Sequence, residues 1–300
     1  MPRDKLTPIA VAQNSEYSTR LLAAQARLYT DAKNVHDVRV TIVLILSTVT
    51  IIAALMLPAI RPLIGATGGI AALLWSAVAS DRERRRRREA AFVQEEFDTH
   101  VFNLPWNDLA ADHPSPTLIA EAAARYRGNR TQDWYPDTKN VVRPLDVLIC
   151  QRSNLGWGSS MHRYYAACLT GALLLLVVGA AAVSLVFHMS VVDMLTAVLV
   201  PLLAPLRELI EMIKANRDSG ETKAKLEAKV LSLWSQGMRG PNLPTVSDCR
   251  AVQDRILGIR QSNAHVPDWL DSLRRNRTES IMQQSAAHLI SEAIQHGRVR

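Results

Sequence analysis

Four long stretches without charge constrain the fold of this chain more than any other feature. Apart from Asp193, no charged side chain falls within residues 40–57, 62–80, 164–187 and 189–206. A helix needs about 20 mostly apolar residues to cross the ~30 Å hydrocarbon core of a bilayer. Buried helices of a soluble protein are the alternative, but such helices usually keep a polar face, which these stretches lack. The pattern therefore predicts four transmembrane helices.

The arginine-rich run that follows the second stretch indicates the orientation of these helices. Lys and Arg in short segments that flank a span stay on the cytoplasmic side. The connection "LPAIRPLIG" holds only Arg61, and "FHMSVVD" holds no Lys or Arg. We therefore expect two hairpins, with both termini and the central segment in the cytosol. The residues that carry this topology are Arg84, Arg85, Arg86, Arg87 and Arg88.

The same run could instead bind nucleic acid. The net charge of +7 is largely explained by the topological arginines, and no aromatic residues are interleaved with them. We therefore expect no nucleic-acid polymer as a partner, and instead expect contact with anionic lipid headgroups. A charged amphipathic segment without a small-residue cleavage site precedes the first span, which gives no sign of a signal peptide.

The expected fold class is all-α, an integral membrane protein with four transmembrane helices in two hairpins and helical cytosolic segments. The expected regions are an N-terminal amphipathic helix (1–39), hairpin one (40–80), a central segment (81–163), hairpin two (164–213) and a C-terminal helical region (214–300). Helical periodicity and cap residues predict further helices at 15–39, 82–97, 115–126, 221–236, 248–261 and 267–295. Loops are expected at 101–109, 130–140 and 152–160.

Within the second hairpin, three residues are candidates for gating or for lining a pore. Asp193 lies near the turn, so an interfacial position competes with a position along an ion path. Pro201 and Pro205 each remove a backbone hydrogen bond from the fourth span, which predicts either a hinge or a static bend. Small residues around 65–72 and 171–182 make the second and third spans candidates for close helix packing.

Catalytic and metal-binding patterns are missing from the sequence. The three cysteines are isolated, which fits a reducing compartment, and the eight histidines show no metal-ligand spacing. The glycines of "LGWGSS" lack the spacing of a dinucleotide-binding loop. We therefore expect no enzyme activity, no metal and no resident cofactor.

Several longer motifs carry a resemblance to a known family. They are "QEEFDTHVFNLPWN" at 94–107, "DWYPD" at 133–137, "CQRSNLGW" at 150–157 and "QDRILGIRQSNAHVPDWL" at 253–270. With "AQARLYTDAK" near the N-terminus and the four apolar stretches, the chain resembles the SMODS-associated four-TM effectors of bacterial CBASS anti-phage operons. Positions that match the family pattern are Asp98, Trp106, Asp133, Trp134, Tyr135, Arg152, Asn154 and Trp157.

The resemblance implies a pore-forming effector of abortive infection that is triggered by a cyclic oligonucleotide from a partner nucleotidyltransferase. Trp134, Tyr135 and Trp157 can stack on nucleobases, and Arg152 can bond phosphate. The same aromatic side chains can instead anchor at the membrane interface or fill a core. We expect a homo-oligomer, because four spans with little polar lining cannot easily enclose water alone. The alternative function is a membrane-anchored adaptor that conducts nothing and recruits a cytosolic partner protein.

Overall fold

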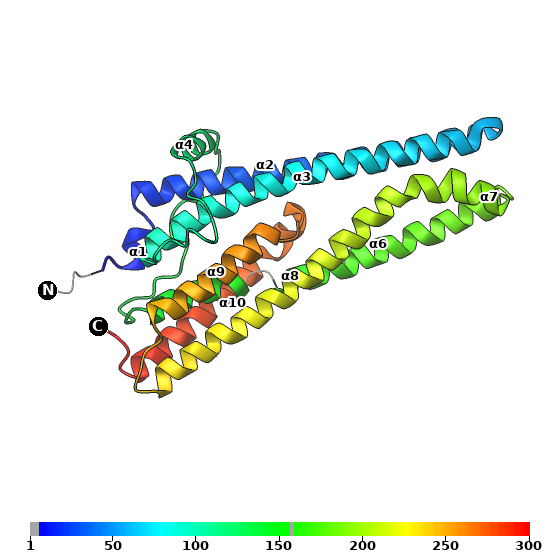
Figure 1. Ribbon diagram of the computed structural model, residues 1–300. Coiled ribbons are helices and arrows are strands. Elements are labelled where there is room, and N and C mark those ends of the chain that lie inside the picture. The colour runs from blue at the N-terminus through cyan, green and yellow to red at the C-terminus, as the bar shows by residue number, and fades with distance from the viewer. Residues whose placement is uncertain (1–5, 157–158) are drawn as a thin grey trace. The chain divides into compact units, whose positions relative to one another are not determined.

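The computed structural model describes residues 6–156 and 159–300, and it is built from helices (Figure 1). The elements are α1 (Ile9–Ala12), α2 (Glu16–Met56), η1 (Pro58–Ile60), α3 (Arg61–Phe102), α4 (Pro116–Ala124), α5 (Leu145–Gly156), α6 (Ser159–Val186), α7 (Val191–Met194), the π-helical segment η2 (Leu195–Leu199), α8 (Val200–Arg239), α9 (Val246–Ser262) and α10 (Asp268–Gln295). The all-α fold class is confirmed.

The chain divides into two compact units. The core unit comprises residues 1–30, 86–162 and 219–300, and the span unit comprises residues 31–85 and 163–218. The helices α2, α3 and α8 each contribute residues to both units. Each unit is therefore assembled from segments that lie far apart in the sequence.

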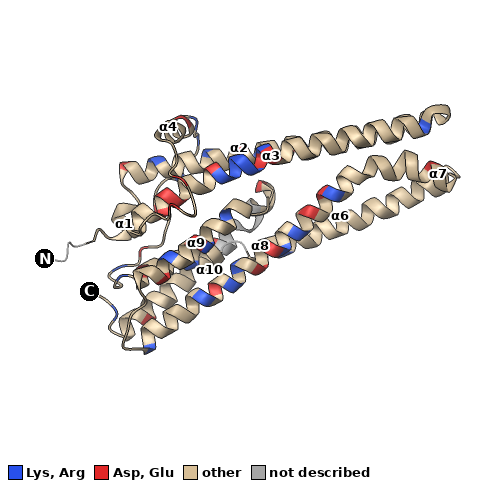
Figure 2. Ribbon diagram, in the orientation of Figure 1, with Lys and Arg blue, Asp and Glu red and all other residues tan. Residues whose placement is uncertain are grey.

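The span unit holds the uncharged parts of the long helices. Figure 2 shows long parts of α2, α3 and α6 with almost no charged residue. Three segments are long and apolar enough to cross a membrane, at 16–56, 58–102 and 145–186. The fourth predicted span, 189–206, is divided among a turn, α7, η2 and the first turns of α8. Three of the predicted spans thus have helices fit for the task, while a fourth crossing stays a prediction.

Glycines of α3 let this helix approach its neighbours closely within the span unit. A methyl group at Gly65 would lie 1.8 Å from the carbonyl oxygen of Thr196, in the π-helical segment. One at Gly68 would lie 2.1 Å from Oγ1 of Thr50 on α2. By contrast, nothing lies within 4 Å of such a methyl group at Gly179 on α6 in the described structure. The glycines of the second predicted span therefore contact other helices of the same chain. Gly179 of the third predicted span lies on a helix face that no other part of the described chain covers.

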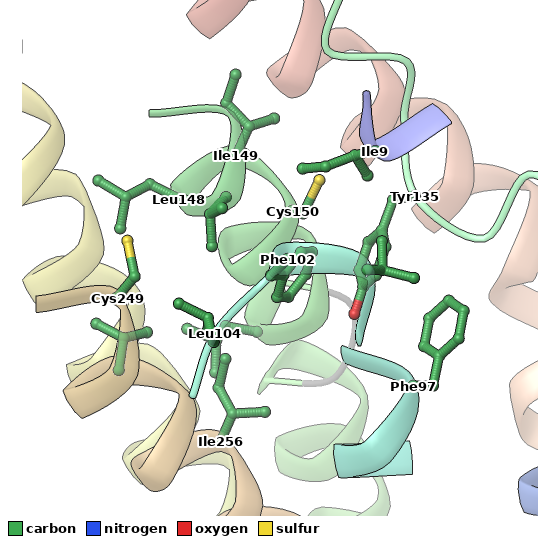
Figure 3. Packing of buried hydrophobic residues seen from close by; sticks show 14 of the residues in the cluster. Ile9, Phe97, Phe102, Leu104, Tyr135, Leu148, Ile149, Cys150, Cys249 and Ile256 are labelled. Atoms are coloured by element: carbon green, nitrogen blue, oxygen red, sulfur yellow. The ribbon is translucent and has the colours of Figure 1, made fainter. Parts of the chain in front are cut away.

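The core unit has a continuous hydrophobic core (Figure 3). Leu21 and Leu28 fall at helical spacing on the N-terminal helix, and both are fully buried in this core. The helix begins where expected, since the backbone N–H of Ser18 donates to Ser15 Oγ over 3.2 Å, as at a helix N-cap. The remaining core comes chiefly from the end of α3, from α5, and from α9 and α10. Figure 3 labels ten members of this core, which are Ile9, Phe97, Phe102, Leu104, Tyr135, Leu148, Ile149, Cys150, Cys249 and Ile256.

Two expectations about local structure are wrong. A loop was predicted at 152–160, but α5 continues to Gly156. The first turns of α5 are buried and favour a helix, and the polar residues that follow continue that helix. The helix predicted to begin at 221 is instead part of the preceding one, because α8 runs from Val200 to Arg239 without a break at Gly220. One glycine costs a helix only about 1 kcal/mol, which the packing of Val230 and Trp234 in the core offsets.

The C-terminal residues return to the central segment. Val141 and Val299 form an isolated antiparallel bridge. The backbone N–H of Val142 donates to the carbonyl of Arg298 over 2.9 Å, and the N–H of Arg300 donates to that of Asn140 over 2.7 Å. The segment 298–300 thereby fixes the entry of the chain into α5.

Candidate functional site

Asp98 is the centre of a buried polar network in the core unit. Its Oδ1 accepts a hydrogen bond from the Tyr135 hydroxyl over 2.5 Å, and its Oδ2 accepts one from Gln253 Nε2 over 2.8 Å. Arg260 Nη1 forms an ion pair with the same Oδ2 at 2.7 Å. Asn154 Nδ2 donates to the Tyr135 hydroxyl over 2.8 Å. Three positions of the family pattern, Asp98, Tyr135 and Asn154, therefore meet in one network.

Glu95 extends this network one turn earlier on α3. It pairs with Arg250 at 2.6 Å and accepts a hydrogen bond from Gln253 over 2.9 Å. Burial, together with the negative charge of Asp98, raises the pKa of Glu95. Burial and the same charge raise the pKa of the Tyr135 hydroxyl well above its usual value, so this group stays protonated and donates to Asp98. The network connects α3, α5, α9 and the loop that carries Tyr135. These contacts between separate elements help to hold the fold together.

The "DWYPD" loop is also fixed by the N-terminal segment. Asp133 has a φ of 50°, and its backbone N–H and carboxylate exchange hydrogen bonds with the Asn14 side chain over 3.0 and 2.9 Å. The Gln13 side chain bonds both backbone groups of Tyr135, accepting over 2.7 Å and donating over 3.2 Å. Between them, Trp134 remains 39% exposed. Trp134 is thus held on an anchored loop with part of its ring open to contact.

A cavity of about 500 Å³ lies between this loop and α10. Its volume is within the range of small-molecule sites. The α10 wall is mainly apolar, and the loop wall carries one acidic and one basic side chain. The lining residues are Pro136, Asp137, Lys139, Gln283, Ala286, Ala287, Ile290, Ser291 and Ile294. The cavity therefore begins two residues after Trp134.

The other motif residues lie apart from this cavity lining. Arg152 pairs with Glu227 at 3.0 Å and donates to Ser285 Oγ. Trp106 stacks on His113 with ring centroids 4.2 Å apart, and its Nε1 donates to the carbonyl of Ala111 over 2.9 Å. Trp157 lies outside the described residues. Tyr135 and Arg152 would have to exchange existing partners to bind a ligand.

The gating candidates lie on the second hairpin of the span unit. The N–H of Asp193 donates to Ser190 Oγ over 3.2 Å at the start of α7, and the carboxylate pairs with Arg61 at 3.2 Å. The two hairpin turns are thereby joined by an ion pair. Pro201 is the second residue of α8, separated from η2 by Val200, and Pro205 lies further inside α8. The π-helical segment and the two prolines both depart from the regular hydrogen-bond ladder of an α-helix.

The arginine run lies within α3 and does not interrupt it. Arg84 pairs with Asp81, and Arg86 with Glu89 at 3.0 Å, both on the same helix. Arg84, Arg85 and Arg88 are exposed. These placements are compatible with a solvated segment that follows an apolar one.

A buried ionic group in the span unit was missed by the sequence analysis. Arg39 of α2 lies between Glu83 of α3 and Glu208 of α8, with Nη2 3.0 Å from Glu83 Oε2 and Nη1 2.5 Å from Glu208 Oε2. Ser76 donates to Glu208 as well, and His36 Nδ1 lies 3.2 Å from Glu83 Oε2. We call these five residues the Arg39 cluster. Their position at the ends of charge-free stretches was the available signal.

Comparisons with known proteins agree with the motifs. A family model described as the SMODS-associating 4TM effector domain matches residues 7–289. A Bacillus cereus (strain VD146) protein described as a "Probable CBASS effector molecule" is 27% identical over 289 residues, which cover 91% of this chain and 95% of the relative. No solved structure matches the chain. With a match over nearly its whole length, this chain belongs to the SMODS-associating 4TM effector family.

Proposed function

We propose that this protein is a non-enzymatic membrane effector of anti-phage defence that opens a pore when it binds a cyclic oligonucleotide. The family and the relative's description support the defence role. The single observation that supports membrane action is the set of three helical segments that are long and apolar enough to cross a bilayer. The partner nucleotidyltransferase, the homo-oligomer and the lipid bilayer as target belong to this proposal.

Helix continuity supplies a route for the signal. The helices α2, α3 and α8 contribute both to the core unit and to the span unit. A ligand that changes packing in the core unit can thereby act on the spans without a flexible linker. To change the ratio of open to closed protein from about 1:99 to 99:1, the ligand must bind the open state more tightly by roughly 5.5 kcal/mol. Several stacking and phosphate contacts, shared among copies in an oligomer, are sufficient for this.

The cavity between the "DWYPD" loop and α10 is our candidate for the ligand site. Trp134 offers an exposed ring for stacking on a base, and Lys139 offers a cation for a phosphate. Tyr135 and Arg152 would then act through the loop and through α5, because their polar groups already have partners. Trp134→Ala and Lys139→Gln should weaken the response to ligand and leave folding intact.

Dye leakage from liposomes tests the proposal. Full-length protein is reconstituted, and cyclic di- and trinucleotides are added in turn. We expect leakage with one nucleotide, weaker leakage with Trp134→Ala, and unchanged leakage with Trp106→Phe as the control away from the cavity. If the double variant Pro201→Ala, Pro205→Ala still leaks dye, the prolines do not act as a hinge, but the pore itself is still supported. Failure of every nucleotide would contradict the pore.

The adaptor function is supported by exposed apolar side chains on α10, where Trp269 is 65% exposed and Ile281 is 53% exposed. A partner protein could cover such residues. If the full-length protein gives no leakage and retains a soluble partner only when Trp269 is intact, the adaptor replaces the pore.

The proposed topology places both termini and the arginine run in the cytosol of a bacterial inner membrane, with four crossings. Reporter fusions at Arg130 and Arg300 should both indicate cytosol, and a fusion in the turn at 187–190 should indicate periplasm. A periplasmic signal from Arg130 would overturn this topology. Neutral replacement of Arg84 to Arg88 should weaken orientation or insertion.

A further inference from the structure

Four polar side chains line the cavity between the "DWYPD" loop and α10. Asp137 and Lys139 belong to the loop wall, while Gln283 and Ser291 belong to the α10 wall. The backbone N–H of Lys139 donates to Asp137 Oδ1 over 2.8 Å, which fixes the carboxylate relative to the turn. A carboxylate has about four lone-pair sites, and this bond uses one of them. Asp137 can therefore still accept hydrogen bonds from a ligand in the cavity.

The turn that carries this carboxylate is held on both sides. Before it, the Gln13 side chain bonds both backbone groups of Tyr135. After it, the N–H of Arg300 donates to the carbonyl of Asn140 over 2.7 Å. An acceptor that is already in place loses little conformational freedom when a ligand binds. The cavity therefore presents the Asp137 carboxylate in a defined position, which is what the reading of a base requires.

Hydrogen-bonding chemistry decides which base fits this wall. An ionised carboxylate only accepts and an ammonium only donates, whereas an amide or a hydroxyl can do both. Gln283 and Ser291 can thus adapt to any base, but Asp137 needs donors. Guanine alone presents two adjacent donors, N1–H and N2–H, on its Watson–Crick edge. Adenine and cytosine place a ring-nitrogen acceptor beside their amino group, and uracil flanks its one N–H with two carbonyl oxygens, so each of them would turn a lone pair toward the carboxylate.

We propose that this cavity reads guanine, and that Asp137 selects this base by accepting hydrogen bonds from N1–H and N2–H. The inference rests on the proposed function and names the base that the activating cyclic oligonucleotide carries. Ala287 and Ile290 of the α10 wall offer apolar surface to the face of the base. Lys139 supplies a cation for a phosphate of the ligand, which offsets the negative charge of Asp137.

Base preference in binding tests this site directly. Isothermal titration calorimetry on the detergent-solubilised full chain compares guanosine-only with adenosine-only cyclic di- and trinucleotides. Wild type should bind the best guanosine ligand about tenfold or more tightly than its adenosine counterpart. In Asp137→Asn the amide oxygen can keep the bond to the Lys139 N–H, so the amide NH₂ faces the ligand. This variant should lower the ratio to about one or reverse it, by weakening guanine and strengthening adenine.

The matched control separates base reading from the loss of a negative charge. Glu279→Gln removes the same charge from an exposed position on α10 that lies outside the cavity lining. It should keep the wild-type ratio, even where the lost charge raises the affinity for both anionic ligands. Equal affinity of wild type for the guanosine and adenosine ligands, or an unchanged ratio in Asp137→Asn, would overturn the guanine site.

Binding and dye leakage together separate this inference from the proposed function. If a cyclic nucleotide binds and causes leakage without a preference for guanine, the guanine site is wrong and the pore stands. If the guanosine ligand binds with a preference that Asp137→Asn removes, but the liposomes do not leak, the site stands and the pore is wrong. If no guanosine ligand binds to wild type, the guanine site is overturned, whichever other nucleotide causes leakage.

Discussion

The two units of this protein bury arginine–carboxylate pairs in different ways. In the core unit, Asp98 and Glu95 have several donors, including neutral ones from Tyr135 and Gln253. In the span unit, Arg39 pairs with both Glu83 and Glu208, Ser76 donates to Glu208, and His36 Nδ1 lies 3.2 Å from Glu83 Oε2. Neutral hydrogen-bond donors continue to stabilise a carboxylate even when its arginine partner moves away. The comparison suggests that neutral donors carry much of the first network, whereas a single arginine shared by two carboxylates is central to the second.

The largest effect should follow loss of the Asp98 carboxylate. Asp98→Ala leaves Arg260, Tyr135 and Gln253 without their shared acceptor in a buried site, which should cost about 3–5 kcal/mol of stability. Thermal unfolding of the full chain in detergent measures this. Asp98→Asn should cost less, because it keeps an acceptor for Tyr135, and the exposed Asp108→Ala should have almost no effect. Equal melting of Asp98→Ala and Asp108→Ala would refute the structural role of the network.

The Arg39 cluster should behave differently when removed singly or as a group. Arg39→Met removes the cation that Glu83 and Glu208 share, so we expect a loss of about 3–5 kcal/mol. Replacing Arg39 by Met together with Glu83 and Glu208 by Leu should restore stability to within about 1–2 kcal/mol of wild type, because no uncompensated charge remains. If the triple variant melts as low as Arg39→Met, the cluster is as much a scaffold as the Asp98 network.

Close packing should distinguish α3 from α6 within the span unit. Gly65→Ala places a methyl group against the backbone of Thr196, which should cost about 2–3 kcal/mol through displacement of the π-helical segment. The matched control is Gly171→Ala on α6, where nothing lies within 4 Å in the described structure. In contrast, Gly179→Leu should reduce crosslinked oligomers without lowering the monomer's stability. Unchanged crosslinking would argue against this face of α6 as an oligomer contact.

A smaller effect concerns Lys223 in the core unit. Burial, with the nearby Arg260, lowers the pKa of Lys223 from 10.5 to about 8, and its Nζ lies 3.1 Å from His162 Nε2. Between pH 8 and 10.5 the unfolded chain holds this proton and the folded chain does not, so this residue makes stability rise with pH. We expect a rise of about 1–2 kcal/mol relative to Lys223→Met, allowing for partial exposure. Lys225→Met, at an exposed site, should keep the wild-type slope.

Much of the helical framework could be predicted from local sequence. Runs without charge, an N-cap such as Ser15 and the spacing of Leu21 and Leu28 are short-range signals, and they located α2 well. The end of α5 and the course of α8 past Gly220 were missed because tertiary packing there outweighs polar residues and glycine. The fourth apolar stretch was seen, but not its division between a turn, a π-helical segment and α8.

The candidate sites were harder to predict for a physical reason. Motif likeness pointed to Asp98, Tyr135 and Asn154 without saying that they bond to one another, because their contacts join separate segments. Arg39 and Glu208 are 169 positions apart, so no periodicity relates them. The Trp134 prediction needed only local aromatic chemistry, and its exposed ring leaves that prediction open to test.

The division of the chain into units has a consequence for biosynthesis. The span unit is complete once residue 218 has been made, whereas the core unit requires residues 219–300. At about 5–20 residues per second, ribosomes need roughly 4–16 seconds for that remainder. During this interval the hairpins can already be in the membrane while the core unit, our proposed ligand-sensing part, is unfinished. If the proposed pore is correct, a newborn copy has to be kept closed by contacts internal to its spans, and an arginine close to the N-terminus of the first hairpin is available from the start.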